Sequence, residues 1–334
     1  MRSSQIRASL LVLASYLLGF SPAALAEKAN TISPPNITIL STMAANFAGI
    51  GEWGFSALIS TPEEDILFDT GFKARTVLDN AKSLNVTLGS IEKVVLTHFH
   101  TDHTGGLLTL RRAHMDKYPQ ALSKVYVGKG FFRQRYNSKH EPSYSLGTTD
   151  TQTFDRPEEF RAAAEALGIQ FIEVSNTLEI VPGIFLTGPI PRIHNEENYS
   201  PGSLLKTKEG YQPDWIPESQ VLGINTERGW MLISGCGHAG IVNASEKLPQ
   251  TIDQPIVMGI GGFHLFRADS QTIAWTAGQL QKFGLQKFLG AHCTGVSATY
   301  QIGEALELPH SEISIGAVGT RVDSSLKIIK ASIE

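Results

Sequence analysis

The sequence has no basic segment and few long apolar runs, and both absences narrow its function. No Lys/Arg-rich run is present and the formal net charge is −4, which disfavours a nucleic-acid partner that needs a basic groove. After an N-terminal run at residues 10–20, no apolar run is long enough to cross a membrane. Low-complexity tracts are also absent, as is typical of an ordinary globular protein. With 334 residues the chain can bury a large core, as one domain or as two tightly joined halves.

Cysteine is also scarce, with only Cys236 and Cys293. In an oxidising compartment these two residues could form one disulfide. Each of them, however, lies beside a histidine, in Cys236-Gly237-His238 and in His292-Cys293. That placement makes metal binding or active-site chemistry at least as good an interpretation for one of them.

The N-terminus is predicted to be a signal peptide, residues 1–26. Arg2 and Arg7 precede the apolar run, and Ala24-Leu25-Ala26 follows it with small residues at the cleavage-site positions. An uncleaved membrane anchor is the alternative, although the run is short for a membrane span. Loss of the two arginines would change the net charge from −4 to about −6. We therefore expect a polar lead at residues 27–36 and a folded domain at residues 37–334, in a soluble protein that is exported to the periplasm or secreted.

Short apolar runs alternate with helix-spaced patterns along the rest of the chain. In the first half we expect strands at residues 37–43, 55–60, 66–69, 94–97, 125–127 and 171–174, and helices at residues 73–84, 105–115 and 157–167. In the second half we expect strands at residues 184–187, 221–225, 230–234, 255–260, 287–291 and 313–317, and helices at residues 240–248, 270–283 and 298–306. This order predicts an α/β fold in which two sheets pack face to face with helices outside. Residues 128–154 and 189–219 show little periodicity, which is typical of lids, binding loops or plain surface insertions.

The strongest chemical signal is the cluster His98-Phe99-His100-Thr101-Asp102-His103. A buried-strand pattern before it and two glycines after it place the cluster on a strand-to-helix loop. As alternate residues, His98 and His100 can point the same way. Asp102 and His103 can turn toward a second position. Three imidazoles and a carboxylate suit zinc, and also iron or manganese.

This cluster resembles the histidine-rich signature of the metallo-β-lactamase superfamily. Upstream, residues 66–71 resemble the superfamily's first motif, a strand that ends in aspartate. The resemblance implies an αβ/βα sandwich with metals along one edge of the two sheets. It implies that His98 and His100 bind one metal, and that Asp102 and His103 bind another. Asp69 would orient a ligand or the motif loop, unless it only ends a strand at a turn.

The remaining ligands are expected on two Gly-rich loops that follow strands in the second half. Histidines just beyond strand ends are well placed to reach a shared edge site. His292 matches the superfamily's last ligand, and His238 is the next candidate. Cys236 stands where the superfamily usually has a metal-bridging aspartate, and a thiolate could replace that carboxylate on zinc.

A narrower resemblance rests on the second-half motifs. Residues 235–241, 261–264 and 292–295, together with residues 186–192, are similar to dihydropterin-aminobenzene-phosphate synthase-like proteins. By this analogy His264 is a metal ligand, a proton donor or a substrate contact. Arg192 follows a loop held stiffly by prolines, where its guanidinium could clamp a substrate phosphate or carboxylate, or else form a structural ion pair.

The predicted function is that of an exported metal-dependent hydrolase with two divalent ions, zinc or else iron or manganese. A hydroxide shared by the ions would attack a small ester, lactone, phosphodiester or amide, with Asp102 and His264 as catalytic residues. The alternatives are transfer chemistry like that of the pterin subgroup, a β-lactamase, a di-iron oxidoreductase, and a non-catalytic metal- or ligand-binding protein on the same fold. The expected partner is a small molecule, with no nucleic acid and no membrane span after signal cleavage.

Overall fold

The computed structural model describes residues 30–334 except 144–145, 149–152, 155 and 197–201. The predicted signal peptide, residues 1–26, therefore lies outside the described residues, as does the start of the predicted polar lead. Among the helices within the described ranges, none combines the length and the apolar character that a membrane span requires.

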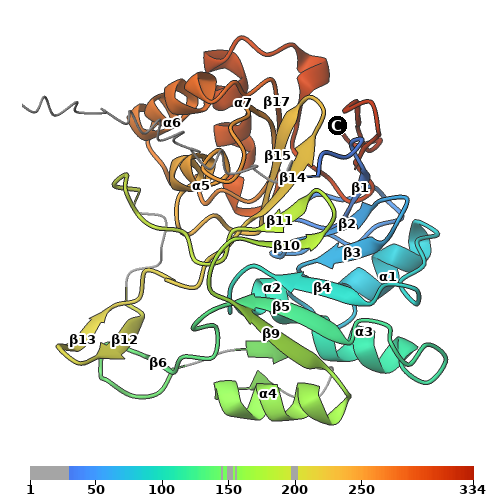
Figure 1. Ribbon diagram of the computed structural model, residues 1–334, viewed down its shortest axis with the longest axis vertical. Coiled ribbons are helices and arrows are strands. Elements are labelled where there is room, and N and C mark those ends of the chain that lie inside the picture. Colours follow the sequence, from blue (N-terminus) through green and yellow to red (C-terminus); the bar gives the residue numbers. More distant parts are fainter. Residues whose placement is uncertain (1–29, 144–145, 149–152, 155, 197–201) are drawn as a thin grey trace, which may run out of the picture.

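Two large mixed sheets form the centre of the molecule (Figure 1). In spatial order, the first sheet contains β20 (Ile328–Ile329), β19 (Arg321–Val322), β1 (Asn36–Ser41), β2 (Ser56–Ser60), β3 (Asp65–Phe68), β4 (Lys93–Leu96), β5 (Lys124–Gly128) and β9 (Gln170–Val174). The second sheet contains β10 (Leu178–Val181), β11 (Ile184–Leu186), β14 (Leu222–Thr226), β15 (Gly229–Ser234), β16 (Ile256–Gly261), β17 (Lys287–Gly290) and β18 (Ile313–Ser314). Strands β3, β4, β5 and β9 run parallel, as do β15, β16, β17 and β18. Each sheet therefore has a parallel half, whose strands all end at one edge.

Helices cover the outer face of each sheet, on opposite sides of Figure 1. The first sheet is covered by α1 (Thr76–Ser83), α3 (Leu107–His114) and α4 (Pro157–Ala166), and the second by α5 (Ile241–Lys247), α6 (Ser270–Lys282) and α7 (Val296–Ala305). Side chains on a strand point alternately to its two faces. Ile66 and Phe68 of β3 accordingly enter the core between the sheets, whereas Leu67 joins the core under the helices. The predicted α/β sandwich with outer helices is confirmed.

Each expected strand and helix is present, with ends that differ by three residues or fewer. The prediction that residues 128–154 and 189–219 lack regular structure is wrong in part. They contain β6 (Arg135–Tyr136), β12 (Leu204–Thr207) and β13 (Gly210–Pro213), which form a small sheet, and the pair β7 (Leu146–Thr148) and β8 (Thr153–Phe154).

A buried ion-pair group joins these two segments. Arg135 is fully buried, with its Nε atom 3.1 Å from Asp214 Oδ2 and its Nη2 atom 2.7 Å from Glu218 Oε1. Its guanidinium also lies 3.7 Å from the centre of the ring of Phe99, the residue between His98 and His100 in the sequence. Sequence periodicity did not reveal this group because Arg135 is about 80 residues from both acids, and long-range ion pairs leave no local pattern.

Candidate metal centre

Four strand ends meet at one edge of the sandwich and carry the candidate ligands. The histidine-rich cluster follows β4, and part of it forms a short helix, α2 (Thr101–Thr104), where a loop was expected. Cys236 and His238 follow β15, His264 follows β16, and His292 follows β17. Because β15, β16 and β17 are parallel neighbours, the loops after them lie side by side and face the cluster of the first sheet.

Gly235, on the loop after β15 of the second sheet, lies directly against Thr97 and Asp69 of the first sheet. A Cβ atom at this position would lie 2.2 Å from Thr97 Oγ1 and 2.3 Å from Asp69 Oδ2, too close for any side chain. Glycine therefore lets the loop after β15 reach the ligands that follow β4.

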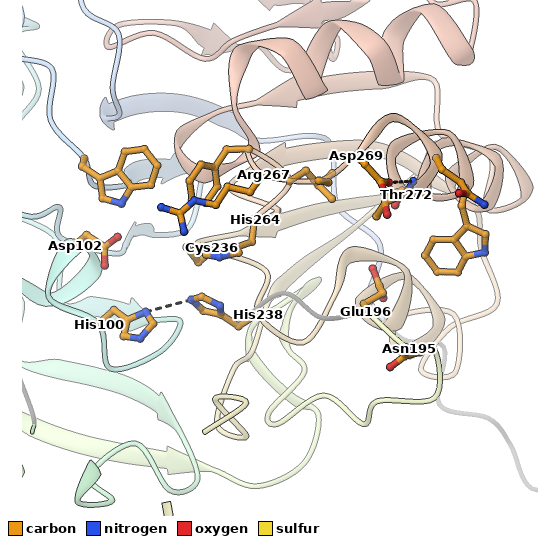
Figure 2. A pocket seen from close by; sticks show the side chains of 17 residues that line it. His100, Asp102, Asn195, Glu196, Cys236, His238, His264, Arg267, Asp269 and Thr272 are labelled. Carbon is orange, nitrogen blue, oxygen red and sulfur yellow. Dashed lines mark hydrogen bonds between the residues drawn. The ribbon is translucent and has the colours of Figure 1, made fainter. Parts of the chain in front are cut away.

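His98, His100 and His238 form the first ligand group, which we call the three-histidine group. His98 Nε2 lies 2.8 Å from His100 Nδ1, and His238 Nε2 lies 3.2 Å from the same Nδ1 atom (Figure 2). Burial, together with the neighbouring histidines, holds the pKa of His98 well below its usual value, and burial lowers the pKa of His100 to about 4. The imidazoles of His98 and His100 are therefore neutral at physiological pH, as metal ligands must be.

Asp102, His103, Cys236 and His292 form the second ligand group, which we call the mixed group. His292 Nε2 lies 3.3 Å from Asp102 Oδ2 and 3.5 Å from Cys236 Sγ. Burial alone would raise the pKa of Asp102, but His103 and His292 hold it well below its usual value. Burial alone would lower the pKa of His292, but the Cys293 sulfur and Asp102 raise it to about 10. A metal ion at this group would therefore displace a proton from His292.

Asp69 lies behind the mixed group and orients it. Its Oδ2 atom lies 2.7 Å from His103 Nδ1, and its Oδ1 atom accepts a hydrogen bond from the Thr97 backbone N–H at 2.8 Å. The bond to Nδ1 leaves His103 Nε2 to face the other ligands. This Nε2 atom is buried and has no hydrogen-bond partner within the described structure. A buried imidazole nitrogen of this kind, beside a carboxylate and a sulfur, fits a metal ion.

Three of the nine non-glycine residues with a positive φ angle in the described part of the chain lie at the same edge. Asp69, His264 and His292 have φ angles of 52°, 50° and 44°, in the left-handed region that residues with a Cβ atom rarely adopt. Each such residue costs about 1–3 kcal/mol and persists only where its surroundings impose it. Strained positions of this kind occur at functional sites, and these three residues all lie among the candidate ligands or directly behind them.

Cys236 also belongs to a third group, with His264 and Cys293. The two sulfur atoms are 2.9 Å apart, and His264 Nδ1 lies 3.6 Å from Cys236 Sγ. Burial and the neighbouring Cys293 raise the pKa of the Cys236 thiol. Burial alone would also raise the pKa of Cys293, but its hydrogen bond with Cys236 and the nearby His292 lower it.

A pocket of about 1430 Å³ opens over the ligands (Figure 2). Its lining includes His100, Asp102, Cys236, His238 and His264, and on the far side residues of the segment that leads into α6. The sequence interpretation missed further lining residues, among them Trp53, Glu196, Phe266, Arg267 and Trp275. For Arg267 a signal was available, because it follows His264 by three residues on the same loop. Trp53 and Glu196 have no such neighbour in the sequence.

Arg192 binds backbone carbonyls beside the site. Its Nη1 atom donates to Glu196 O at 2.6 Å, and its Nη2 atom donates to Trp215 O at 2.8 Å and to His238 O. These bonds hold the loop that carries His238. The geometry therefore favours a positioning role for Arg192 over the predicted clamp on a substrate.

Two mixed sheets with outer helices and a His/Asp/Cys cluster at their common edge define an α/β sandwich protein that can hold metal ions. The chain belongs to the metallo-β-lactamase superfamily, whose family model matches residues 54–242. The fold and the family that the sequence motifs predicted are thereby confirmed.

Within this superfamily, the chain is similar to several individual proteins. The chain is 30% identical to a 7,8-dihydropterin-6-methyl-4-(β-D-ribofuranosyl)-aminobenzene-5′-phosphate synthase from Methanocaldococcus jannaschii, over 83% of this chain and 94% of the relative. Among solved structures, a metal-dependent hydrolase of the β-lactamase superfamily matches with a TM-score of 0.68 at 23% identity, over 86% of this chain and 98% of that one. Zinc-bound PqqB from Methylobacterium extorquens matches with a TM-score of 0.50 at 12% identity, over 86% and 99% of the two chains. The predicted resemblance to the synthase is confirmed, and the two structures share the fold.

Proposed function

We propose that the protein is a metal-dependent hydrolase that holds two divalent ions, in the first instance zinc. The three-histidine group would bind one ion and the mixed group the other. The observation that carries this proposal is the contact between two complete ligand groups beside one pocket: the His98 and His103 rings, one from each group, have centroids 4.3 Å apart. Groups this close can hold two ions that act on the same substrate atom.

Two bound ions would supply a nucleophilic hydroxide at neutral pH and would stabilise the negative charge that develops on a carbonyl or phosphoryl oxygen. Two side chains at the pocket, Asp102 and His264, would contribute to the same reaction. Asp102 stays ionised and offers its carboxylate at the pocket wall, within 3.3 Å of His292 Nε2. His264 is half-buried and lines the same pocket, where its imidazole can donate a proton to a leaving group or contact the substrate.

The pocket supports a substrate with a planar group and an anionic group. Trp53 and Phe266 lie edge to face with ring centroids 5.1 Å apart, and Trp275 belongs to the same lining. Aromatic rings of this kind offer flat apolar surface to a planar substrate. Arg267 lies 5.0 Å from the Phe266 ring centre and offers a charged guanidinium to a phosphate or carboxylate. A small ester, lactone, phosphodiester or amide with both features would fit.

The second candidate is transfer chemistry like that of the synthase. It is favoured by the 30% identity to that relative over nearly the whole of both chains. Transfer chemistry would use the same ligands and the same pocket, because the metal ligands do not determine whether water or another nucleophile attacks the substrate. Formation of the product in the relative's name, detected by mass spectrometry, would favour this candidate over hydrolysis.

The test combines metal analysis with a substrate screen. Purified protein is analysed for zinc, iron and manganese, and is then assayed against aryl esters, lactones, phosphodiesters and a chromogenic β-lactam. We expect two metal ions per chain and saturable hydrolysis of one of these classes. Two ions without turnover of any substrate would instead support a binding protein on the same fold, and no bound metal would contradict the proposal.

We also propose that the protein is exported, as the N-terminal pattern of charged, apolar and small residues indicates. Cell fractionation followed by N-terminal sequencing of the purified protein tests this. We expect a mature chain that begins after Ala26 in the periplasmic or secreted fraction. A full-length chain in the cytoplasm would contradict export. It would also favour the synthase candidate, because the cytoplasm is the compartment in which a biosynthetic reaction is expected.

A further inference from the structure

The pair Cys236 and Cys293 has a geometry that the proposed reaction does not use. Their Sγ atoms lie 2.9 Å apart, and both side chains are buried, with exposed fractions of 3% and 0%. A disulfide has its sulfur atoms about 2.05 Å apart, so the two need to approach by less than about 1 Å. The two buried thiols are therefore near enough to form a disulfide after a small movement.

The strand between the two cysteines allows the contact. Cys236 follows β15 and Cys293 follows β17, and β16 lies between these strands in the sheet. The chain leaving β16 passes through Gly262, where a Cβ atom would lie 2.9 Å from Cys293 Sγ and 2.0 Å from Gly235 O. Because Gly262 has no side chain, the sulfur atoms can meet across the intervening strand. The backbone N–H of His264, two residues later, lies within 3.3 Å of Cys293 Sγ and helps to hold it there.

Cys236 therefore has two partners that exclude each other. In the mixed group its sulfur lies 3.5 Å from His292 Nε2, where a thiolate would help Asp102 to balance the charge of a metal ion. In a disulfide that sulfur carries no charge and is no longer a thiolate ligand. We propose that Cys236 and Cys293 form a reversible disulfide that removes Cys236 from the mixed group and releases the metal ion bound there. This inference rests on the second metal ion of the proposed function.

The chemistry requires a disulfide oxidant, such as oxidised glutathione. Cys236 lines the pocket, whereas Cys293 lies beneath it, so Cys236 is the thiol that a small disulfide reaches first. Because burial and Cys293 raise the pKa of Cys236, only the deprotonated fraction of this thiol attacks; it bonds to one sulfur of the oxidant and displaces one glutathione thiolate. Cys293 then attacks the mixed disulfide at Cys236 and displaces the second glutathione. Two protein thiols are oxidised, one oxidised glutathione is reduced to two thiols, and the two protons pass to them.

The experiment compares metal-free and zinc-loaded protein, each treated with oxidised glutathione. Free thiols are alkylated, the intact mass is measured, and bound zinc is counted before and after treatment. We expect the metal-free protein to lose both free thiols, and the zinc-loaded protein to lose them at least about tenfold more slowly. The oxidised protein should bind one zinc ion fewer per chain than the reduced protein, and a thiol reductant should restore that ion.

Cys293→Ser is the matched variant, because it keeps Cys236 for the metal but cannot form the disulfide. Its reduced form should bind as much zinc as the original protein, and circular dichroism checks that it is folded. Three results would overturn the inference: metal-free protein that keeps both thiols, oxidised protein that keeps all of its zinc, or a third zinc ion on the reduced pair. If the reduced protein never binds a second ion, the proposed function fails as well, and the mass measurement still shows whether the disulfide forms.

Discussion

The two ligand groups differ in charge although they share one edge of the fold. The three-histidine group offers three imidazoles, which carry no charge when they bind a metal ion, and burial lowers the pKa of His98 and His100. The mixed group offers a carboxylate and a sulfur besides two imidazoles, and Asp69 orients one of these from behind. An ion held by neutral ligands keeps its full positive charge, whereas an ion held by a carboxylate and a thiolate is largely neutralised. The first group is therefore suited to polarising a substrate, and the second depends on the state of its anionic residues.

The largest effect is expected from removal of the three-histidine group. The double substitution His98→Ala and His100→Ala leaves His238 as that group's only ligand, so we expect one metal ion fewer per chain and a fall in turnover of about a thousandfold or more. Metal analysis and steady-state kinetics measure both. His310→Ala, at an exposed position outside the site, is the control. Activity that survives the double substitution would refute the proposed hydrolase.

A smaller effect is expected from Asp69→Asn, which keeps the size of the side chain but removes its charge. Without the carboxylate at 2.7 Å, His103 Nδ1 loses the partner that keeps Nε2 directed at the metal. We expect affinity for the second ion to fall about 10–100-fold, with the first ion unaffected. Metal-binding titrations followed by calorimetry measure the two ions separately. Asp79→Asn, at a surface ion pair with Arg75, should change neither; equal weakening of both ions would show that the groups are not independent.

Gly235→Ala tests the close approach of the two sheets. The added Cβ would collide with Thr97 Oγ1 and Asp69 Oδ2, so we expect the free energy of unfolding to fall by about 1–3 kcal/mol. Chemical denaturation of the metal-free protein measures this loss. Gly278→Ala in α6 is the matched control, because a Cβ there meets nothing within 4 Å and alanine favours a helix. If both substitutions behave alike, the two sheets are not in contact at Gly235.

The smallest effect is expected from Arg267→Met, which acts on the substrate and leaves both ligand groups intact. Because this guanidinium is exposed, water weakens its attraction for an anion, and we expect KM to rise about tenfold with little change in kcat. Steady-state kinetics with the substrate from the screen measure this split. Arg228→Met, at the exposed turn between β14 and β15, should leave KM unchanged. A fall in kcat with unchanged KM would mean that Arg267 does not bind the substrate.

The sequence predicted the elements and the ligand-bearing loops well because both depend on local patterns. The apolar run of β3 and the three histidines after β4 lie within short stretches of chain. The pocket was predicted less well. Trp53 and Glu196 reach it from distant segments, and Arg135 pairs with Asp214 and Glu218, which follow it by about 80 residues. No local pattern records contacts of that kind.

By itself, the sequence determined the family, the α/β sandwich and the residue types of the ligands, because strand periodicity and the spacing within the cluster are properties of neighbouring residues. The tertiary structure decided which of these ligands belong to the three-histidine group and which belong to the mixed group. Only the packing of two sheets with Gly235 between them places His238 with His98 and His100. Only the parallel arrangement of β15, β16 and β17 brings Cys236 to both His292 and Cys293. The physical reason is that parallel strands bring their ends to one edge whatever their separation along the chain.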